Sequence, residues 1–233
     1  MLIAGFPAGA FAANCFVVAS EEGGPCVIVD PGQDAVPRLQ SLLAEHRVTP
    51  VAVLLTHGHL DHTASAADVC RTAGIPAYIH HDDAYMLDDP LAALSPELRT
   101  ALAGLPTSGL RPDEVIELSD LDEPGLADLP LTIDHVPGHT GGSVVYRFAA
   151  DGDRPEILFT GDTLFAGSIG RTDLPGGSLE QELASITTRM LSRAEDAVVL
   201  SGHGPATTVG NEMATNPFLI PGAWVADPGP AGR

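Results

Sequence analysis

A histidine-rich segment carries the strongest chemical signal in this sequence. From His57 to His62 it reads His-Gly-His-Leu-Asp-His, so three imidazoles and one carboxylate fall within six residues. These side chains cannot all be ordinary core residues, because each brings polar atoms that need a partner. Imidazole and carboxylate groups suit zinc, iron or manganese. Alternate residues of an extended loop point the same way, so His57 and His59 can face one point and Asp61 and His62 a neighbouring one. The segment therefore predicts a metal centre with room for two adjacent ions.

Three later polar residues extend this pattern. His139, Asp162 and His203 each follow an apolar run that is typical of a strand, and each has a neighbouring glycine that lets the backbone turn sharply. Together with the first segment they supply five histidines and two aspartates as candidate ligands.

The elements that must position these residues follow a mixed α/β pattern. Apolar runs predict two short strands within residues 1–19, the second at 14–19, and further strands at 26–29, 51–55, 77–80, 115–118, 131–136, 143–148, 156–160 and 197–200. Helices are expected at 34–46, 62–73 and 82–87. A further helix is expected to run from a cap at Ser178, with Gln181 three residues later, to about Arg193. Residues 88–113 suggest a helical excursion or flap. The polar motifs lie just after strand ends, which indicates a site built at strand C-termini. We expect one domain over residues 1–220 and a loose Pro/Gly-rich tail over 221–233.

The composition excludes several classes of protein. The chain has 233 residues, with 31 acidic side chains against 11 basic ones, all arginine, and a net charge of -20. Such a charge disfavours nucleic-acid binding and a polybasic membrane anchor. Hydrophobic residues make up 44% of the chain, too many for a disordered acidic segment.

The N-terminal segment and the cysteines indicate a cytoplasmic protein. The apolar start has no basic residue before Arg38, and its glycines and prolines interrupt any membrane span, so we expect neither a signal peptide nor a membrane anchor. Cys15, Cys26 and Cys70 are an odd number without a CxxC pair, and we expect them to be buried thiols in a reducing compartment.

At these motifs the chain resembles the metallo-β-lactamase-fold hydrolases, and most closely the small glyoxalase II-like (hydroxyacylglutathione hydrolase-like) branch. The likeness runs in order from Asp30-Pro31-Gly32 through the histidine-rich segment to Gly202-His203-Gly204, and the segment from Gly167 to Asp173 resembles a subgroup signature. The resemblance implies an αβ/βα four-layer sandwich of two mixed β-sheets flanked by helices, with the metals at one edge.

The resemblance also implies a ligand set for two divalent ions, with zinc as the expected metal and iron or manganese as alternatives. The first ion would bind His57, His59 and His139, the second Asp61, His62 and His203, and Asp162 would bridge both.

The activity that the resemblance implies is hydrolysis of a 2-hydroxyacyl thioester by a hydroxide held between the metals, because metal binding lowers the pKa of water from about 16 to about 7. Asp61 would orient the hydroxide and accept its proton, so Asp61 and Asp162 are the expected catalytic carboxylates. Glyoxalase II enzymes recognise glutathione partly with basic residues, and this chain has no lysine. Arg171 is therefore the expected cationic substrate contact, with a salt bridge to Asp173 as the alternative, and the thiol carrier stays open.

Other functions remain open at this point. A persulfide dioxygenase of the same fold would hold one iron with His57, His59, His139 and Asp162. A lactonase would use the same ligands as the thioesterase. A non-catalytic binding module is disfavoured, because it predicts lost ligands and none is lost. The expected partner is a small-molecule thioester, with neither nucleic acid nor membrane.

The remaining polar residues are expected to be structural. We assign His46, His80, His81 and His135 to this class, with a supporting position behind the ligands as the alternative for His135. Asp30 is expected to accept hydrogen bonds from the ligand loops. The acidic pairs Asp82-Asp83 and Asp88-Asp89 are expected to form a solvated face.

Overall fold

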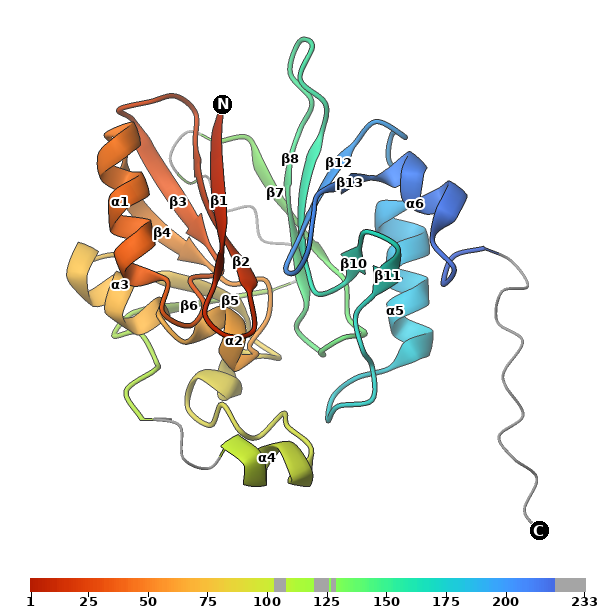
Figure 1. Ribbon diagram of the computed structural model, residues 1–233, viewed down its shortest axis with the longest axis horizontal. Helices are drawn as coiled ribbons and strands as arrows, with labels where there is room; N and C mark the ends of the chain where they lie inside the picture. The colour runs from red at the N-terminus through yellow and green to blue at the C-terminus, as the bar shows by residue number, and fades with distance from the viewer. Residues whose placement is uncertain (103–107, 120–125, 127–128, 221–233) are drawn as a thin grey trace.

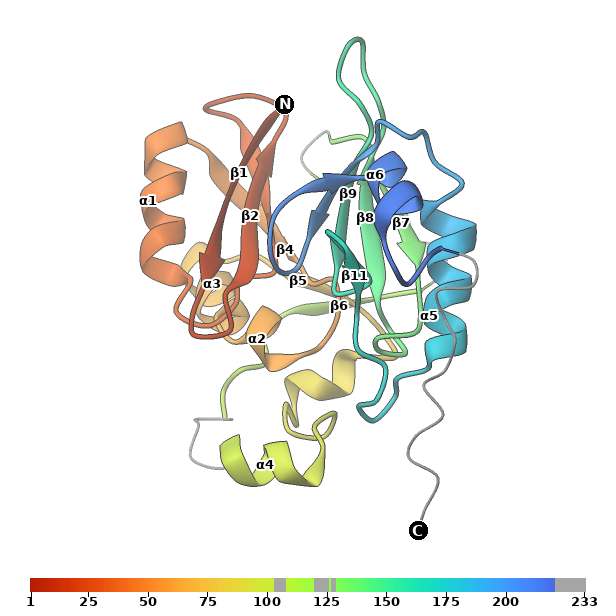
Figure 2. The same ribbon diagram turned by 45° about the vertical axis from the view of Figure 1, so that its right-hand side comes forward.

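Two main β-sheets dominate the computed structural model, which describes residues 1–102, 108–119, 126 and 129–220 (Figures 1 and 2). The first sheet has the order β1-β2-β3-β4-β5-β6, with antiparallel pairing from β1 to β3 and parallel pairing from β3 to β6. Its strands are β1 (Leu2–Ala8), β2 (Ala13–Ala19), β3 (Pro25–Val29), β4 (Thr49–Leu54), β5 (Ala77–His80) and β6 (Val115–Leu118).

The second sheet has the order β13-β12-β9-β8-β7, and only the pair of β12 with β9 is parallel. Its strands are β7 (Leu131–His135), β8 (Val144–Phe148), β9 (Ile157–Gly161), β12 (Val198–Ser201) and β13 (Thr207–Thr208). A small hairpin of β10 (Leu164–Phe165) and β11 (Ser168–Ile169) follows β9.

Helices cover the outer faces of both sheets (Figure 1). The helices α1 (Val36–His46) and α3 (Ala66–Ala73) pack on the first sheet through a cluster that includes Leu39 and Val69, and α5 (Leu179–Ser185) lies on the second sheet with α6 (Val209–Thr215). The expected αβ/βα sandwich of two mixed sheets is therefore confirmed.

The inner faces of the two sheets share one hydrophobic core. Val27 and Leu54 of the first sheet belong to the same buried cluster as Phe148 and Phe159 of the second. Tyr146 lies fully buried on β8, and its hydroxyl donates a hydrogen bond of 2.9 Å to the carbonyl oxygen of Leu55, the residue that follows β4. A polar bond thus joins the two sheets inside an apolar core.

Most expected strands and helices are present, but the helix expected at 62–73 is broken. The structure has α2 (Leu60–Thr63) and then α3, with Ser65 between them in a non-helical conformation. The backbone N–H of Ser65 donates to the carbonyl of Pro31, and its hydroxyl donates to that of Gly32. Ser65 therefore bonds to the turn after β3 instead of continuing one helix.

Further differences concern short elements. Residues 84–87 form a 3-10 turn instead of the expected helix at 82–87. The Ser178 side chain caps α5 by accepting a hydrogen bond from the Gln181 N–H, as expected. The helix α5 then continues as a π-helical segment at Ile186–Met190. The excursion contains α4 (Pro96–Leu102), while its residues 103–107 and the tail from 221 lie outside the described residues. The sequence analysis did not identify β10, β11, β13 and α6. Across the described part of the chain, no helix has the length and apolar character that crossing a membrane requires.

The bond between Tyr146 and Leu55 leads to a stability prediction. Tyr146→Phe removes the donor and leaves the buried Leu55 carbonyl unsatisfied, so we expect the free energy of unfolding to fall by about 1–2 kcal/mol. Urea denaturation measures this change. Tyr85→Phe, at a half-exposed tyrosine, is the control and should be neutral; an equal loss in both variants would contradict the role of the inter-sheet bond.

Candidate metal centre

The seven ligand candidates come from loops of both sheets and meet at one edge of the sandwich. His57 and His59 follow β4, and Asp61 and His62 lie on α2. The other three, His139, Asp162 and His203, follow β7, β9 and β12. Segments that follow four strands, β4, β7, β9 and β12, therefore bring the ligand candidates to one place, as the pattern of polar residues after strand ends predicts.

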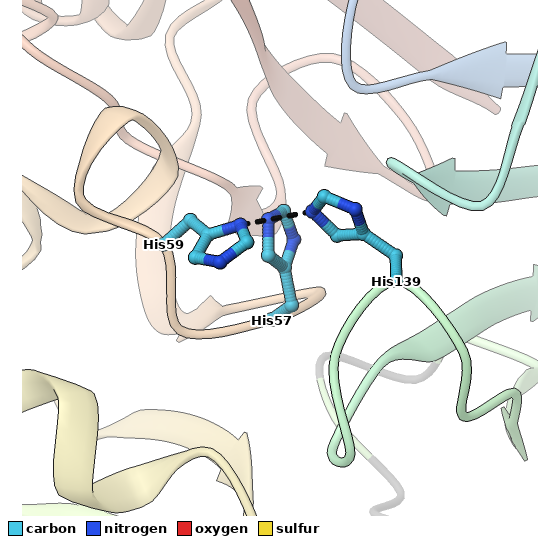
Figure 3. A group of neighbouring side chains, drawn as sticks. All are labelled: His57, His59 and His139. Carbon is cyan, nitrogen blue, oxygen red and sulfur yellow. Dashed lines mark hydrogen bonds between the residues drawn. The ribbon is translucent and has the colours of Figure 1, made fainter. Parts of the chain in front are cut away.

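The first group contains His57, His59 and His139, whose imidazoles converge from two loops (Figure 3). All three residues are buried. His59 Nδ1 lies 2.8 Å from His139 Nε2, and the ring centroids of His57 and His139 lie 4.8 Å apart. Three nitrogen donors thus face one another at a spacing that one metal ion can span.

The second group contains Asp61, His62 and His203. Asp61 Oδ2 lies 3.2 Å from His203 Nε2 and 3.6 Å from His62 Nε2. His203 and Asp61 keep 30% and 24% of their side-chain surface exposed, whereas His62 is fully buried. This group therefore forms the solvent-facing side of the centre.

Asp162 lies between the two groups. Its carboxylate oxygens lie 3.3 Å from His62 Nε2, 3.6 Å from His203 Nε2 and 3.8 Å from His139 Nε2. A Cβ added at Gly202 would come within 2.2 Å of Asp162 Oδ1, so only glycine allows this approach. The position matches the bridging role that the family resemblance implies for Asp162.

Asp30 supports the first loop, as expected from the sequence. It is buried, and its carboxylate accepts hydrogen bonds from the Thr56 backbone N–H at 2.8 Å and the Thr56 hydroxyl at 2.6 Å. Its Oδ2 also lies 3.0 Å from His62 Nδ1, which directs Nε2 of that ring toward the centre. A ligating histidine held by a carboxylate through its other nitrogen is a common arrangement in metal sites.

Asp83 corrects the expectation of a solvated acidic face. Asp82, Asp88 and Asp89 are exposed, but Asp83 is fully buried. Its carboxylate accepts hydrogen bonds from the Gly58 N–H at 2.9 Å, the Thr140 hydroxyl at 2.7 Å and the Gly142 N–H at 2.8 Å. Gly58 separates His57 from His59, and Thr140 follows His139. Asp83 therefore ties together the two loops that carry the first group.

Glu182 is a second buried carboxylate that the sequence analysis missed. Its Oε2 accepts a hydrogen bond of 2.8 Å from the backbone N–H of His139, while His139 Nδ1 bonds to the carbonyl oxygen of Arg171 at 2.8 Å. Burial raises the pKa of Glu182 to about 8. This side chain and the Arg171 carbonyl hold the His139 backbone and ring in place.

Two imidazoles of the first group, those of His57 and His59, are kept neutral. Burial and then the neighbouring histidines lower the pKa of His57 well below its usual value, and burial together with His139 lowers the pKa of His59 to about 3. A neutral imidazole has a lone pair on one ring nitrogen, which is the form that binds a metal.

The second group concentrates negative charge. Burial opposes ionisation of Asp61 and Asp162, but His62 and the other nearby histidines lower the pKa of both carboxyls. Burial would lower the pKa of His62, but Asp162 and Asp61 raise it well above the usual histidine value. A hydrogen bond to Asp61 and the charge of Asp162 also raise the pKa of His203, so both histidines of this group favour the protonated form beside these carboxylates.

The residues fit a metal ion on independent grounds. His57 Nε2 and His59 Nε2 are buried and have no hydrogen-bond partner within the described structure. Buried polar atoms without partners are costly, and here both belong to ligand candidates at the centre. Neutral imidazoles, ionised carboxylates and unpaired donor atoms together form a donor set for divalent cations.

The other polar residues of the sequence analysis lie outside this set. Arg171 forms two 2.8 Å bonds to Asp173, so the salt-bridge alternative is present in the structure. His46 lies at the end of α1 near Glu22. The ring of His80 stacks on the ring of His135, with the centroids 4.1 Å apart. The side chains of His80, His81 and Asp82 form a small group that could hold a metal ion, and His81 and Asp82 in this group are exposed. His135 also bonds through Nε2 to the Gly141 carbonyl, and thus supports the His139 loop.

Comparison with known proteins gives a family match. A family model described as the Metallo-beta-lactamase superfamily matches residues 8–203. Rv2581c of Mycobacterium tuberculosis strain H37Rv is 49% identical, with 94% of this chain and 98% of the relative covered. The probable metallo-hydrolase YqgX of Bacillus subtilis is 37% identical, and the hydroxyacylglutathione hydrolase GloC of Haemophilus influenzae is 33% identical; in both cases 91% of this chain and 95% of the relative are covered.

Solved structures agree with this match. The BLEG-1 B3 metallo-beta-lactamase has a TM-score of 0.78 and 36% identity, covering 94% of this chain and 99% of its own. TTHA1623 in a di-iron-bound form has a TM-score of 0.75 and 34% identity, covering 91% and 97%.

The contacts of Asp83 predict a selective loss of metal binding. Asp83→Ala leaves the N–H groups of Gly58 and Gly142 without an acceptor, whereas the Thr140 hydroxyl keeps its 2.7 Å contact with the Ser143 hydroxyl. We expect the free energy of unfolding to fall by about 2–3 kcal/mol and the first metal site to bind about tenfold to a hundredfold more weakly. Competition with a chromophoric chelator measures the affinity. Asp89→Asn is the exposed control and should bind metal normally. Unchanged metal affinity in a folded Asp83→Ala protein would contradict the loop-tying role.

The charge states predict how acid removes metal. Protons compete for His62, whose pKa is raised, before they compete for His57 and His59, whose pKa values are lowered. Lowering the pH from 8 to 5 should therefore release metal from the Asp61 group first and leave the three-histidine group loaded. Elemental analysis after dialysis at each pH should show a stepwise loss, and simultaneous loss from both groups would contradict this order.

Proposed function

The chain belongs to the metallo-beta-lactamase superfamily and is a metal-dependent hydrolase, and we propose that it hydrolyses a 2-hydroxyacyl thioester, as glyoxalase II-like enzymes do. The observation that carries the proposal is the complete set of seven ligands, arranged as two groups with Asp162 between them. The likeness to the hydroxyacylglutathione hydrolase GloC supports the substrate class.

The proposed centre holds two divalent ions. His57, His59 and His139 would hold one, Asp61, His62 and His203 the other, and Asp162 both. Ions bound there polarise a carbonyl group and lower the pKa of a bound water to about 7. Zinc is our first candidate, and the di-iron-bound form of TTHA1623 supports iron as the second.

The protein's own residues complete the reaction. Asp61 is partly exposed, and the neighbouring histidines keep its pKa low, so its carboxylate is ionised and can accept a hydrogen bond from an attacking water and orient it. The partial exposure of Asp61 and His203 marks the side from which substrate approaches. A thiol has a pKa of about 8.5, so a thiolate is a good leaving group and needs little help from a general acid. No serine or cysteine nucleophile is required.

The proposed partner is a small-molecule thioester, and the net charge of -20 disfavours nucleic acid and anionic membranes. We also propose a cytoplasmic location, because Cys15, Cys26 and Cys70 are buried and free in the structure.

The test combines metal content with thiol release. We expect about two metal ions per chain and release of free thiol from S-lactoyl thioesters. Asp61→Asn should lower kcat/KM by about a hundredfold or more, because the ionised group that orients the water is lost and a metal ligand is impaired. Asp196→Asn, at an exposed acid on the turn before β12, is the matched control and should retain activity.

Other outcomes would replace the proposed substrate. About one iron per chain with oxygen uptake on a persulfide would indicate a dioxygenase. The likeness to BLEG-1 makes a chromogenic β-lactam a necessary member of the panel, next to a lactone. Faster turnover of either compound than of every thioester would contradict the thioester proposal.

A further inference from the structure

A cavity of about 350 Å³ adjoins the metal centre. It lies between the turn after β1, the start of α1 and the α2–α3 segment, and Asp61 is one of its lining residues. Through Asp61 the cavity therefore reaches one residue of the proposed metal centre. Its volume is in the range of pockets that bury a small organic group, and it exceeds the space that a three-carbon 2-hydroxyacyl group fills.

The walls of this cavity combine apolar and acidic side chains. Phe11 is half exposed at the turn between β1 and β2, and Val36 and Leu60 add apolar surface. The charged lining residues are Asp34, Asp61 and Asp68, and neither arginine nor histidine is among the described residues that line it. A ligand in this cavity would therefore contact apolar side chains and negatively charged carboxylates.

Asp34 carries the charge that the protein leaves unbalanced. Asp68 Oδ1 pairs with Arg71 at 3.0 Å, and Asp61 belongs to the proposed metal centre. Asp34 is exposed and forms no ion pair with any residue that the structure describes. A carboxylate of a ligand placed in this cavity would face this uncompensated charge, whereas a cationic group would be attracted to it.

We propose that this cavity receives the thiol half of the substrate. It favours thiols whose part next to the thioester is apolar and either cationic or neutral, and it disfavours thiols that carry a carboxylate at that position. The inference rests on the proposed thioester hydrolysis, and it assigns specificity to Asp34 and Phe11. The half-exposed ring of Phe11 can pack against an alkyl chain or face a cation. A dianionic thiol carrier fits this cavity poorly.

The experiment uses three S-lactoyl thioesters of nearly the same size on the metal-loaded protein. Their thiols are thiocholine, its uncharged carbon analogue 3,3-dimethylbutanethiol, and 3-mercaptopropionate. We expect kcat/KM to fall in that order, with about a five- to tenfold difference between cation and anion at low salt and a smaller one at 0.5 M salt, because salt screens exposed charges.

The variant Asp34→Asn tests the source of the preference. Asp34 has a positive φ of 57°, a conformation that asparagine also tolerates, so this change removes charge without altering the backbone. We expect the cation-to-anion ratio to fall by about threefold. Asp153→Asn removes the same charge at the turn after β8, far from α2 in Figure 1, and should leave the ratio unchanged.

A binding measurement separates this inference from the proposed reaction. Thioethers of the same three thiols, with a methylene in place of the carbonyl, are titrated by calorimetry into the loaded wild type and both variants. Binding in the same order, with a weaker preference only in Asp34→Asn, supports the cavity even if no thioester is hydrolysed. Equal binding of the three thioethers, no binding, or an equal effect of Asp153→Asn would overturn it.

Discussion

The structure depends on one constraint, which is that five histidines and two aspartates share a small and largely buried volume. Their charges and lone pairs must be balanced there, because water cannot do so. In the first group, burial favours the neutral imidazoles of His57 and His59, and in the second group the carboxylates favour protonated His62 and His203. Both arrangements leave donor atoms such as His57 Nε2 without a partner, so the site is poised for cations.

The acidity of the chain separates into groups with different roles. Asp30 and Asp83 are buried and hold loops through hydrogen bonds, and Asp162 lies between the two ligand groups. Most of the other acids that the structure describes are exposed, and some of them, such as Asp68 and Asp173, pair with arginines. The composition alone cannot distinguish these groups, because the same carboxylate is an anchor when N–H groups surround it and a solvated charge when water does.

The sequence was informative for features that depend on neighbouring residues, and less informative for features that depend on residues far away in the chain. The ligand candidates could be identified because they follow apolar runs and carry glycine neighbours. Asp83 could not, because its partners Gly58, Thr140 and Gly142 lie 25 to 59 positions away. The break at Ser65 also depends on distant carbonyls, those of Pro31 and Gly32. The hairpin of β10 and β11 has only two residues in each strand, too few for a periodic pattern to appear.

The division of ligands between two sheets explains where specificity can vary. The distances within the centre depend on how the sheets are joined, and hydrogen bonds near the site make that connection: Val144 N–H donates to the Thr56 carbonyl, and the Asn14 side chain donates to the carbonyls of Ser201 and Gly204. A change in these residues would disturb both sheets and the metal ligands together. Phe11 and Asp34 lie on turns outside this network, so substitutions there can alter which substrate is accepted while the ligand geometry is preserved. The fold thus places the candidate metal ligands on loops that this network holds, and the residues proposed to select the substrate outside it.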